Sequence, residues 1–505
     1  EAPRKASRTM YQNEEGEVVP GRSRVGHLAS GVPGTVAGLL HVLEKYGSMS
    51  RGEVLQPAID LAEDGFRLSG EQAARLNEHR SVLAQFPGSR QYFTKENGEP
   101  YRAGERFVQR DLASTLRRIR DEGRAGFYRG RTAELIAEEM ERGGGLVDEE
   151  DLRRYHVVER EPVTATYRGH RIHTMPPPSS GVAIIQLLNA MKPYDLQEMG
   201  FRASGTVHLM GEAMRRVYAD RAKWLGDPAF FEVPLDTLAD PAYMARRMAS
   251  FDPDRADSSA AIEPGTLRTG ANGTNSTGSE SLETDSSDTK SLDTESLETT
   301  NYATVDGDGR AVAVTTTINA TFGSKVAVSG AGFLLNNEMD DFSAKPGVPN
   351  MYGLIGGEAN AIAPGKRMLS SMSPTIVEDE DGRLTMALGS TGGGTIITNV
   401  FQILVNVLDY GVHIQRAISA GRVHHQWLPD TLYYEPRVLP SDVRENLTRR
   451  GWAVGVSPYG YRGRANGIQV HYGGDASDPS DPIPGTRTVL GGRDPRGGDE
   501  TALGF

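Results

Sequence analysis

A run of small and acidic residues divides this chain of 505 residues into two parts. From Arg268 to Glu298 the sequence is mostly Ser, Thr, Asp, Glu, Gly and Asn, with a stuttering SLET, SLDT, SLET repeat. Such a segment has too little apolar surface to fold by itself, so it predicts a flexible acidic linker. Most segments of this kind are simple tethers between domains, and that interpretation stays open.

Ordered structure is predicted immediately after the linker. The residues NYATVDGDGRAVAVTTTI form two strand-like runs, joined by a turn cluster from Asp306 to Gly309. Thr299 therefore stands where a flexible segment meets a core strand. Cleavage before such a Thr would free an α-amine, with a reference pKa of about 7.7 to 8.0, that can serve as the base for the same residue's hydroxyl. The alternative is that Thr299 and Thr300 reflect β-propensity alone.

Composition excludes several classes of function. The chain is 37% hydrophobic and contains no apolar run long enough to cross a bilayer, as expected of a large globular protein. Its 55 basic and 67 acidic residues give a net charge of −12, without a basic stripe, which argues against a nucleic-acid or anionic-membrane partner. Because Cys is absent, a disulfide framework, a thiolate metal site and a Cys nucleophile are excluded.

Hydrophobic periodicity predicts a mixed α and β body over residues 35–250. Apolar residues recur at helical spacing in TAELIAEEMERGGG, where Gly143 is the predicted stop, and again from Val207 to Val217. The residues PVTATYRGHRIHTM alternate around Arg168 and Gly169 as a hairpin would. Further on, TIITNVFQILVNVLDYG predicts a buried helix.

Nine successive segments resemble the signatures of gamma-glutamyltransferases, also called gamma-glutamyl transpeptidases. They run in order from residue 31 to the C-terminus and are GVPGTVAGL, MPPPSSG, YADRAKWLGDP, TTNYATVD, LLNNEMDDFSAKPGVPNMYG, LSSMSPTIV, GSTGGG, RVHHQWLPD and DPRGGDETALGF. Nine matches in sequence are far more specific than any single motif.

The resemblance implies an α+β fold, the four-layer αββα sandwich of N-terminal nucleophile hydrolases. It implies a precursor that cleaves itself before Thr299 into a heterodimer, with residues 1–267 as the large-subunit region, 268–298 as the linker and 299–505 as the catalytic region. The expected substrates are glutathione and other γ-glutamyl compounds, and the acceptors are water, amino acids or peptides. No metal or organic cofactor is implied, and a periplasmic or extracellular location is expected.

The same resemblance assigns the reacting groups. Thr299 is the expected nucleophile, with the Thr317 hydroxyl near its α-amine and Asn319 close to the substrate. The backbone N–H groups of Gly392 and Gly393 are the expected oxyanion hole. From the residues alone, Thr315, Thr317 and Asn319 fall on one strand face, but they could equally be ordinary polar strand residues, and GGG could be a flexible turn.

The resemblance also assigns the substrate-binding groups. Glu338 and Asp341 are expected to receive the α-ammonium of the glutamyl group, and Ser370 and Ser371 its α-carboxylate. Tyr352 is the expected gate of a lid loop over residues 343–354. Taken alone, NNEMDDF is equally well a solvated acidic turn and the lid an ordinary connector.

Several features depart from the family pattern or invite another interpretation. Asn301 stands where the family usually has His. The family's carboxylate-binding Arg is expected just upstream of Glu1. His424 and His425 are adjacent, so in an extended segment they face opposite ways, and we interpret them as structural.

The sequence leaves two alternative functions. A cephalosporin-acylase-like amidase would share the fold without needing an α-ammonium site, and Glu338 and Asp341 argue against it. A binding protein that never processes is the rival from another class, and retention of Thr299, Thr317, Gly392 and Gly393 argues against it.

Overall fold

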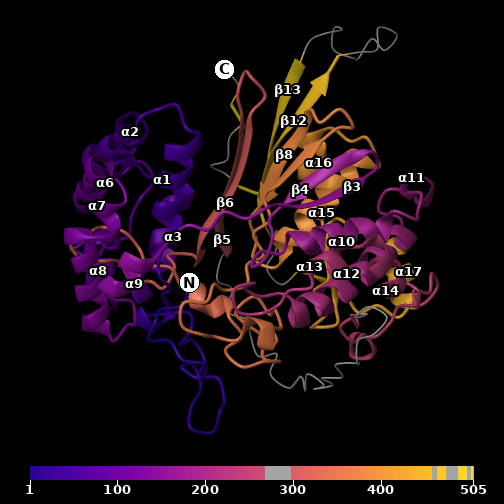
Figure 1. Ribbon diagram of the computed structural model, residues 1–505, viewed down its shortest axis with the longest axis horizontal. Coiled ribbons are helices and arrows are strands. Elements are labelled where there is room, and N and C mark those ends of the chain that lie inside the picture. Colours follow the sequence, from indigo (N-terminus) through magenta and orange to yellow (C-terminus); the bar gives the residue numbers. More distant parts are fainter. Residues whose placement is uncertain (268–296, 458–462, 474–486, 498–501, 504–505) are drawn as a thin grey trace. The chain divides into compact units, whose positions relative to one another are not determined.

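The computed structural model describes residues 1–267, 297–457, 463–473, 487–497 and 502–503 and divides into two compact units (Figure 1). The first unit comprises residues 1–159, 317–344 and 362–368, and the second comprises 160–316, 345–361 and 369–505. Each unit thus draws on both sides of the predicted cleavage site. The predicted division into a large-subunit region, a linker and a catalytic region describes the fragments that cleavage would leave, and it stays a prediction. Most of the predicted linker, residues 268–296, lies outside the described residues.

The first unit is built mainly from helices. Its helices are α1 Thr35–Tyr46, α2 Arg51–Asp64, α3 Gly70–Glu78, α4 Arg80–Leu83, α5 Pro87–Phe93, α6 Arg110–Glu122, α7 Ala125–Tyr128, α8 Gly130–Gly143 and α9 Glu149–Arg154, with the 3-10 turns η1 His27–Ala29 and η3 Glu338–Asp341. Strands β1 Phe66–Arg67 and β2 Arg106–Phe107 pair antiparallel. Its main core packs apolar residues of α6, α7 and α8 against Val326, Val328 and Leu335, which follow the predicted cleavage site in the sequence.

The second unit contains an antiparallel sheet of six strands in the order β13-β12-β8-β7-β4-β3. Its strands are β3 Val163–Tyr167, β4 His170–Thr174, β7 Thr375–Glu378, β8 Leu384–Ser390, β12 Ala465–Tyr472 and β13 Arg487–Arg493. A smaller sheet has the order β11-β10-β9, from β9 Val423–His424, β10 Leu432–Tyr434 and β11 Val454–Val456. The protein is therefore of mixed helix and sheet, as predicted.

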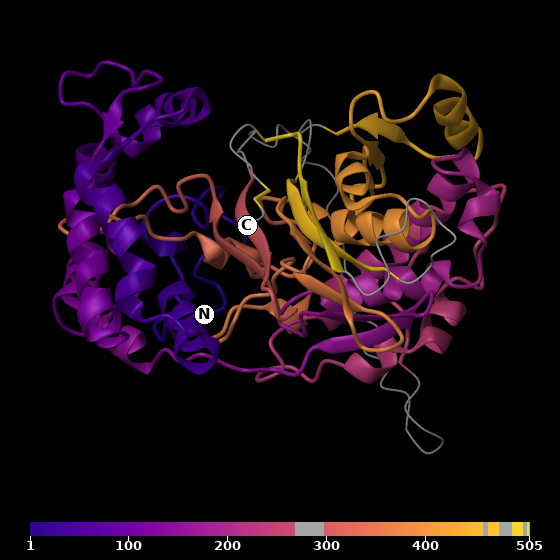
Figure 2. The ribbon, with the colours of Figure 1, turned by 90° about the horizontal axis from the view of Figure 1, so that it is seen from above.

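Helices and a hairpin pack against the large sheet. The helices of this unit are α10 Gly181–Met191, α11 Leu196–Met199, α12 Ser204–Trp224, α13 Leu235–Ala239, α14 Pro241–Arg247, α15 Thr395–Leu408, α16 Ile414–Ser419 and α17 Ser441–Arg449, with η2 Ser259–Ala261 and η4 Glu358–Asn360. Strand β5 Leu297–Val305 pairs with β6 Ala311–Ala320 and packs on β8 and β12. Figure 2 shows β5 on one side of the sheet and α15 on the other.

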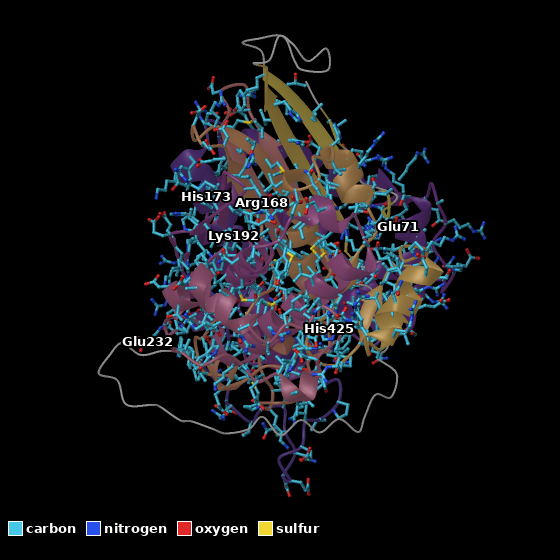
Figure 3. All side chains as sticks on the ribbon, turned by 90° about the vertical axis from the view of Figure 1, so that its right-hand side faces the viewer. Glu71, Arg168, His173, Lys192, Glu232 and His425 are labelled. Carbon is cyan, nitrogen blue, oxygen red and sulfur yellow. The ribbon has the colours of Figure 1, made fainter. Side chains whose placement is uncertain are left out.

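The predicted elements are present, with one boundary displaced. Helix α12 covers the predicted 207–217 segment, and α15 is buried along nearly its whole length. In the β3–β4 hairpin, Arg168 and Gly169 both have positive φ, 50° and 79°, as a two-residue turn of this twist requires. Arg168 donates to the carbonyl of Lys192, which lies beside it in Figure 3. Helix α8 ends one residue later than the predicted stop: Gly144, not Gly143, takes the left-handed conformation that ends it.

A buried ionic network closes the second unit near its C-terminal part. Asp494 is fully buried and receives Arg422 Nη2 at 2.7 Å and Arg496 Nη1 at 2.9 Å. Arg496 also binds Glu435 at 2.6 Å. Burial opposes ionisation of Asp494, but the two guanidinium groups outweigh it and lower the pKa of this carboxyl. Removing one member would leave buried charges without compensation. Within the described part of the chain, no helix has both the length and the apolar character needed to span a membrane.

We expect Asp494→Asn to lower the free energy of unfolding by about 3 to 5 kcal/mol, because it breaks this buried pair from one side. Urea denaturation at neutral pH measures the loss. The matched control is Asp308→Asn, which makes the same change in the exposed Asp308–Arg310 pair. Surface pairs contribute little, so the control should stay close to the parent. Equal losses of unfolding free energy in the two variants would contradict a stabilising role for the buried Asp494 network.

Candidate active site

The predicted nucleophile lies on the packed face of strand β5. The strand runs from Leu297 to Val305, so it passes through the Glu298–Thr299 peptide bond and represents the uncleaved chain. Side chains alternate along a strand. Thr299 is partly buried and Asn301 is 5% exposed, whereas Thr300 and Tyr302 are exposed. The structure thereby distinguishes two adjacent threonines that β-propensity leaves equivalent.

Asn301 anchors this face of β5 to the sheet beneath it. Its side-chain amide donates to the Asn466 carbonyl at 3.4 Å, and Asn466 Nδ2 donates to the Asn301 carbonyl at 3.1 Å. A Cβ at Gly389 of β8 would lie 2.1 Å from Asn301 Oδ1, so β5 can lie this close only over a glycine. Asn301 and Gly389 therefore fix how closely the strand that carries Thr299 approaches β8.

The predicted oxyanion loop connects β8 to α15. Gly392 and Gly393 have φ of 120° and 55°, a conformation that disfavours other residues. Thr395 Oγ1 donates to the Gly392 carbonyl at 2.8 Å, and Tyr218 Oη donates to the Gly394 carbonyl at 2.5 Å. With its carbonyls held in this way, the loop places its N–H groups at the N-terminus of α15, where the helix dipole favours negative charge.

The predicted gate lies directly against this loop. Tyr352 is 5% exposed, and a Cβ at Gly393 would lie 2.7 Å from its ring. Gln426 Nε2 donates to the carbonyls of Tyr352 and Gly353 at 3.2 and 2.8 Å. A pocket opens beside Tyr352 and Thr395 and extends toward Arg422 and Glu435. Ser370 and Ser371 are not among the residues that line it.

The predicted carboxylate serines lie between the PPPSS segment and helix α12. Ser371 Oγ accepts a hydrogen bond from Arg221 Nη2 at 3.0 Å. Ser370 is fixed through its backbone, since its N–H donates to the Pro178 carbonyl at 2.7 Å and its carbonyl accepts from Ser180 Oγ at 2.5 Å. The two serines are thus held in place by groups far away in the sequence.

Thr317, Asn319, Glu338 and Asp341 belong to the first unit. Asn319 Nδ2 donates to the Asn337 carbonyl at 3.0 Å, and its N–H donates to Thr317 Oγ1 at 2.8 Å. These bonds bring the end of β6 next to the residue before Glu338. The φ of Asn319 is 76°, so the simple alternation that predicted its direction does not hold at this position. The side-chain bond to Asn337 fixes it instead.

Glu338 carries a buried oxygen without a hydrogen-bond partner among the described residues. This oxygen is Oε1, whereas the backbone N–H of Glu338 donates to Asn336 Oδ1 at 3.0 Å. Burial raises the pKa of the Glu338 carboxyl to about 7. A buried acceptor in this state is a natural partner for a bound cation.

The two adjacent aspartates have different surroundings. Asp340 is 4% exposed and accepts from Ser23 Oγ at 2.5 Å, with Arg24 Nε at 3.8 Å, so its carboxylate is engaged inside the unit. Asp341 is only partly buried. The structure thus separates a structural aspartate from the one assigned to substrate.

His424 and His425 contact different partners, as their interpretation as structural residues requires. His424 lies between Thr398 Oγ1 and Gln426 Oε1, both at 2.9 Å. His425 pairs with Asp430 at 3.2 Å, and burial lowers its pKa to about 4. Among the residues that the structure describes, no cluster of three or more His, Cys, Asp or Glu side chains could hold a metal ion.

Sequence reasoning missed three residues that touch these groups, namely Tyr218, Arg221 and Ser180. All three lie inside matched segments, YADRAKWLGDP and MPPPSSG. A usable signal was present, because a buried helix that carries both Asp and Arg needs polar partners inside the protein. Which partners they find depends on the fold.

Comparison with known proteins gives one consistent result. The family model for gamma-glutamyltranspeptidase matches residues 1–503. The chain is 44% identical over 483 residues to the glutathione hydrolase proenzyme of Escherichia coli (strain K12), covering 95% of this chain and 78% of that protein. Two solved structures are similar, a cephalosporin acylase from Bacillus halodurans and a gamma-glutamyltranspeptidase from Helicobacter pylori.

The two structures differ in how they match. The acylase is 25% identical with a TM-score of 0.78, covering 98% of this chain and 82% of that one. The transpeptidase is 44% identical with a TM-score of 0.52, covering 54% of this chain and 78% of that one. The match over nearly the whole chain, at this level of identity, shows that the chain belongs to the gamma-glutamyltranspeptidase family.

Proposed function

We propose that this chain is the proenzyme of a glutathione hydrolase and gamma-glutamyltransferase that cleaves itself between Glu298 and Thr299. Family membership supports the activity. The observation that carries the choice of residue is the placement of Thr299 on the packed face of β5, with Thr300 exposed. The heterodimer formed would pair residues before the cleavage site with Thr299–Phe505.

The chemistry follows from the groups assigned to the site. The Thr299 hydroxyl loses its proton to the newly freed α-amine and adds to the γ-carbonyl of the substrate. The Gly392 and Gly393 N–H groups stabilise the oxyanion, each donor contributing about 2.7 to 4 kcal/mol in comparable sites. The intermediate collapses, the C–N bond breaks, and the leaving amine takes the proton. Water or the amine of an amino acid or peptide then attacks the γ-glutamyl ester and regenerates Thr299.

Recognition of the glutamyl group would divide between two sets of side chains. Ser370 and Ser371 would hold the α-carboxylate, while Glu338 and Asp341 would hold the α-ammonium. The buried Oε1 of Glu338, which has no hydrogen-bond partner in the described part of the chain, supports this assignment, because a cation there would satisfy it. Thr317 and Asn319 would orient the nucleophile and the substrate, and Tyr352 would cover the oxyanion loop.

The finer fold and the location are also proposals. Strand β5 packs on β8 and β12 while α10 and α15 pack on the same sheet, which supports an αββα sandwich. A periplasmic or extracellular location follows the family resemblance.

An acylase function is the second candidate, since the similar acylase structure covers nearly the whole chain. The substrates of an acylase need no α-ammonium, so Glu338 favours the γ-glutamyl function.

The first test concerns processing. We expect the full-length chain to convert into two fragments with Thr299 at the new N-terminus, because only this Thr of the pair faces the packed side of β5. Intact mass and N-terminal sequencing measure it. Thr299→Ala should remain one chain, whereas the matched control Thr300→Ala should still be cleaved. A new terminus at Thr300 would refute the assignment.

The second test concerns selectivity. Asp341→Asn should reduce kcat/KM for a γ-glutamyl anilide by roughly 10- to 150-fold, the equivalent of a charge-assisted hydrogen bond worth about 1.5 to 3 kcal/mol. Glutaryl anilide keeps the carboxylate and the chain length but lacks the α-ammonium, so its turnover should change much less. Equal losses for both substrates would show that Asp341 acts on structure.

The third test concerns pH. Glu338 must be ionised to bind an α-ammonium, so KM for the γ-glutamyl anilide should fall as pH rises toward about 7, the pKa of this carboxyl in the free protein. The expected dependence is confined mainly to KM, because bound substrate lowers that pKa. Glu338→Gln should abolish this dependence and raise KM above pH 7.

The same shift affects stability with a defined sign. Because the folded pKa lies above the unfolded value of 4.5, the folded state binds this proton more tightly. The contribution of Glu338 to stability is therefore present at low pH and is lost between about pH 4.5 and 7. Unfolding curves of the parent and Glu338→Gln should diverge over that window, and parallel curves would contradict the burial of this group.

A further inference from the structure

Helix α12 contacts both the oxyanion loop and the serine pair. Tyr218 Oη donates to the Gly394 carbonyl at 2.5 Å, and Arg221 Nη2 donates to Ser371 Oγ at 3.0 Å. The two side chains are three residues apart, so they share one face of the helix. Both are almost fully buried, with 3% and 5% of their surface exposed.

Tyr218 acts on the end of the glycine loop. Burial raises the pKa of its hydroxyl, which therefore stays protonated and remains a donor across the working pH range. The carbonyl it holds belongs to the residue directly after Gly393. An N–H group is effective in an oxyanion hole only when its direction is fixed before charge develops. The Tyr218 hydroxyl supplies a rigid attachment for the loop at that point.

Arg221 fixes the direction of the Ser371 hydroxyl hydrogen. A guanidinium group only donates, so a hydroxyl that accepts from it must direct its own hydrogen elsewhere. Ser371 accepts from Arg221 in this way, and its O–H is left to donate to another group. Arg221 Nε also donates to Ser180 Oγ at 3.0 Å, and Ser180 in turn donates to the Ser370 carbonyl at 2.5 Å. A single guanidinium thus contacts the Ser371 hydroxyl directly and reaches the Ser370 carbonyl through Ser180.

The charge of Arg221 favours the same ligand. A buried cation that donates to the Ser371 hydroxyl stabilises an anion that this hydroxyl binds, because the local dielectric is low. The serine pair alone offers only neutral donors, which are weaker than charge-assisted ones. Arg221 thereby makes this position selective for a carboxylate.

We propose that Tyr218 and Arg221 are positioning residues of the active site, Tyr218 for the oxyanion loop and Arg221 for the carboxylate-binding serines. The proposal rests on the function proposed above for Gly392, Gly393, Ser370 and Ser371. The two residues should have separate kinetic effects, because the oxyanion exists only in the transition state whereas the α-carboxylate is bound throughout.

The experiment compares Tyr218→Phe and Arg221→Lys in the full-length, processed protein. Two substrates are used, a γ-glutamyl anilide and a 4-aminobutyryl anilide, which keeps the amine but lacks the α-carboxylate. Tyr218→Phe should lower kcat about 10-fold for both substrates with KM nearly unchanged, as for one lost hydrogen bond of about 1.4 kcal/mol. Arg221→Lys should raise KM for the γ-glutamyl substrate about 10-fold and leave kcat/KM for the other nearly unchanged.

The matched control is Tyr243→Phe, which removes another buried hydroxyl that contacts the same helix, through Asp220 at 3.0 Å. This change should lower thermal stability without changing either kinetic constant. If Arg221→Lys fails to fold, Ser180→Ala replaces it, because it removes one hydroxyl from the same chain of bonds and should also raise KM for the γ-glutamyl substrate alone.

Failure of this proposal can be distinguished from failure of the proposed function. Turnover by the parent that disappears in Thr299→Ala establishes the function, and its absence would count against the function only. Given an active parent, an unchanged kcat in Tyr218→Phe overturns the role of Tyr218. Equal effects of Arg221→Lys on the two substrates, or none on either, overturn the role of Arg221, as does an unchanged KM in Ser180→Ala.

Discussion

The second unit depends on the pairing of charges along the buried helix α12. Glu212 pairs with Arg215 and Arg216, and Asp220 pairs with Arg247 at 3.0 Å. A buried charge without a partner would cost several kcal/mol. The helix can therefore be buried only in the register that pairs each of these charges. That register also brings Tyr218 under the glycine loop and Arg221 against Ser371. Stability and site geometry therefore share one cause.

Close backbone approach is the second constraint. Strand β5 lies over β8 at Gly389, where Asn301 would meet any Cβ, and Tyr352 lies over Gly393 in the same manner. Glycine at these two positions removes the side chain that would hold the layers apart. The packed face of β5 then separates Thr299 from Thr300. Thr299 and Thr300 point to opposite faces of β5, and their surroundings differ only because β8 covers one of those faces.

The acidic segment shows how burial assigns different roles to similar residues. Asp340 is held by Ser23 and approached by Arg24, which come from the start of the chain. Glu338, two residues earlier, keeps one carboxylate oxygen buried without a partner among the described residues, and its pKa rises to about 7. The first contributes to the fold, while the second is poised for a ligand. The sequence NNEMDDF fits a solvated acidic turn and a substrate-binding segment equally well. The contacts of its side chains are what distinguish the two interpretations.

The local elements and the family could be predicted from short stretches of sequence. The periodicities of α8, α12 and α15 and the turns at Arg168 and at Asp306 depend on neighbouring residues, so they could be predicted, apart from the one-residue shift to Gly144. The ordered series of motifs identified the chemistry. The contacts of Arg221 could not be predicted, because Ser371 lies 150 residues away. The direction of Asn319 could not be predicted either, since a side-chain bond overrides strand alternation there. Only the tertiary structure brings such distant groups together, because their positions depend on how the whole core packs.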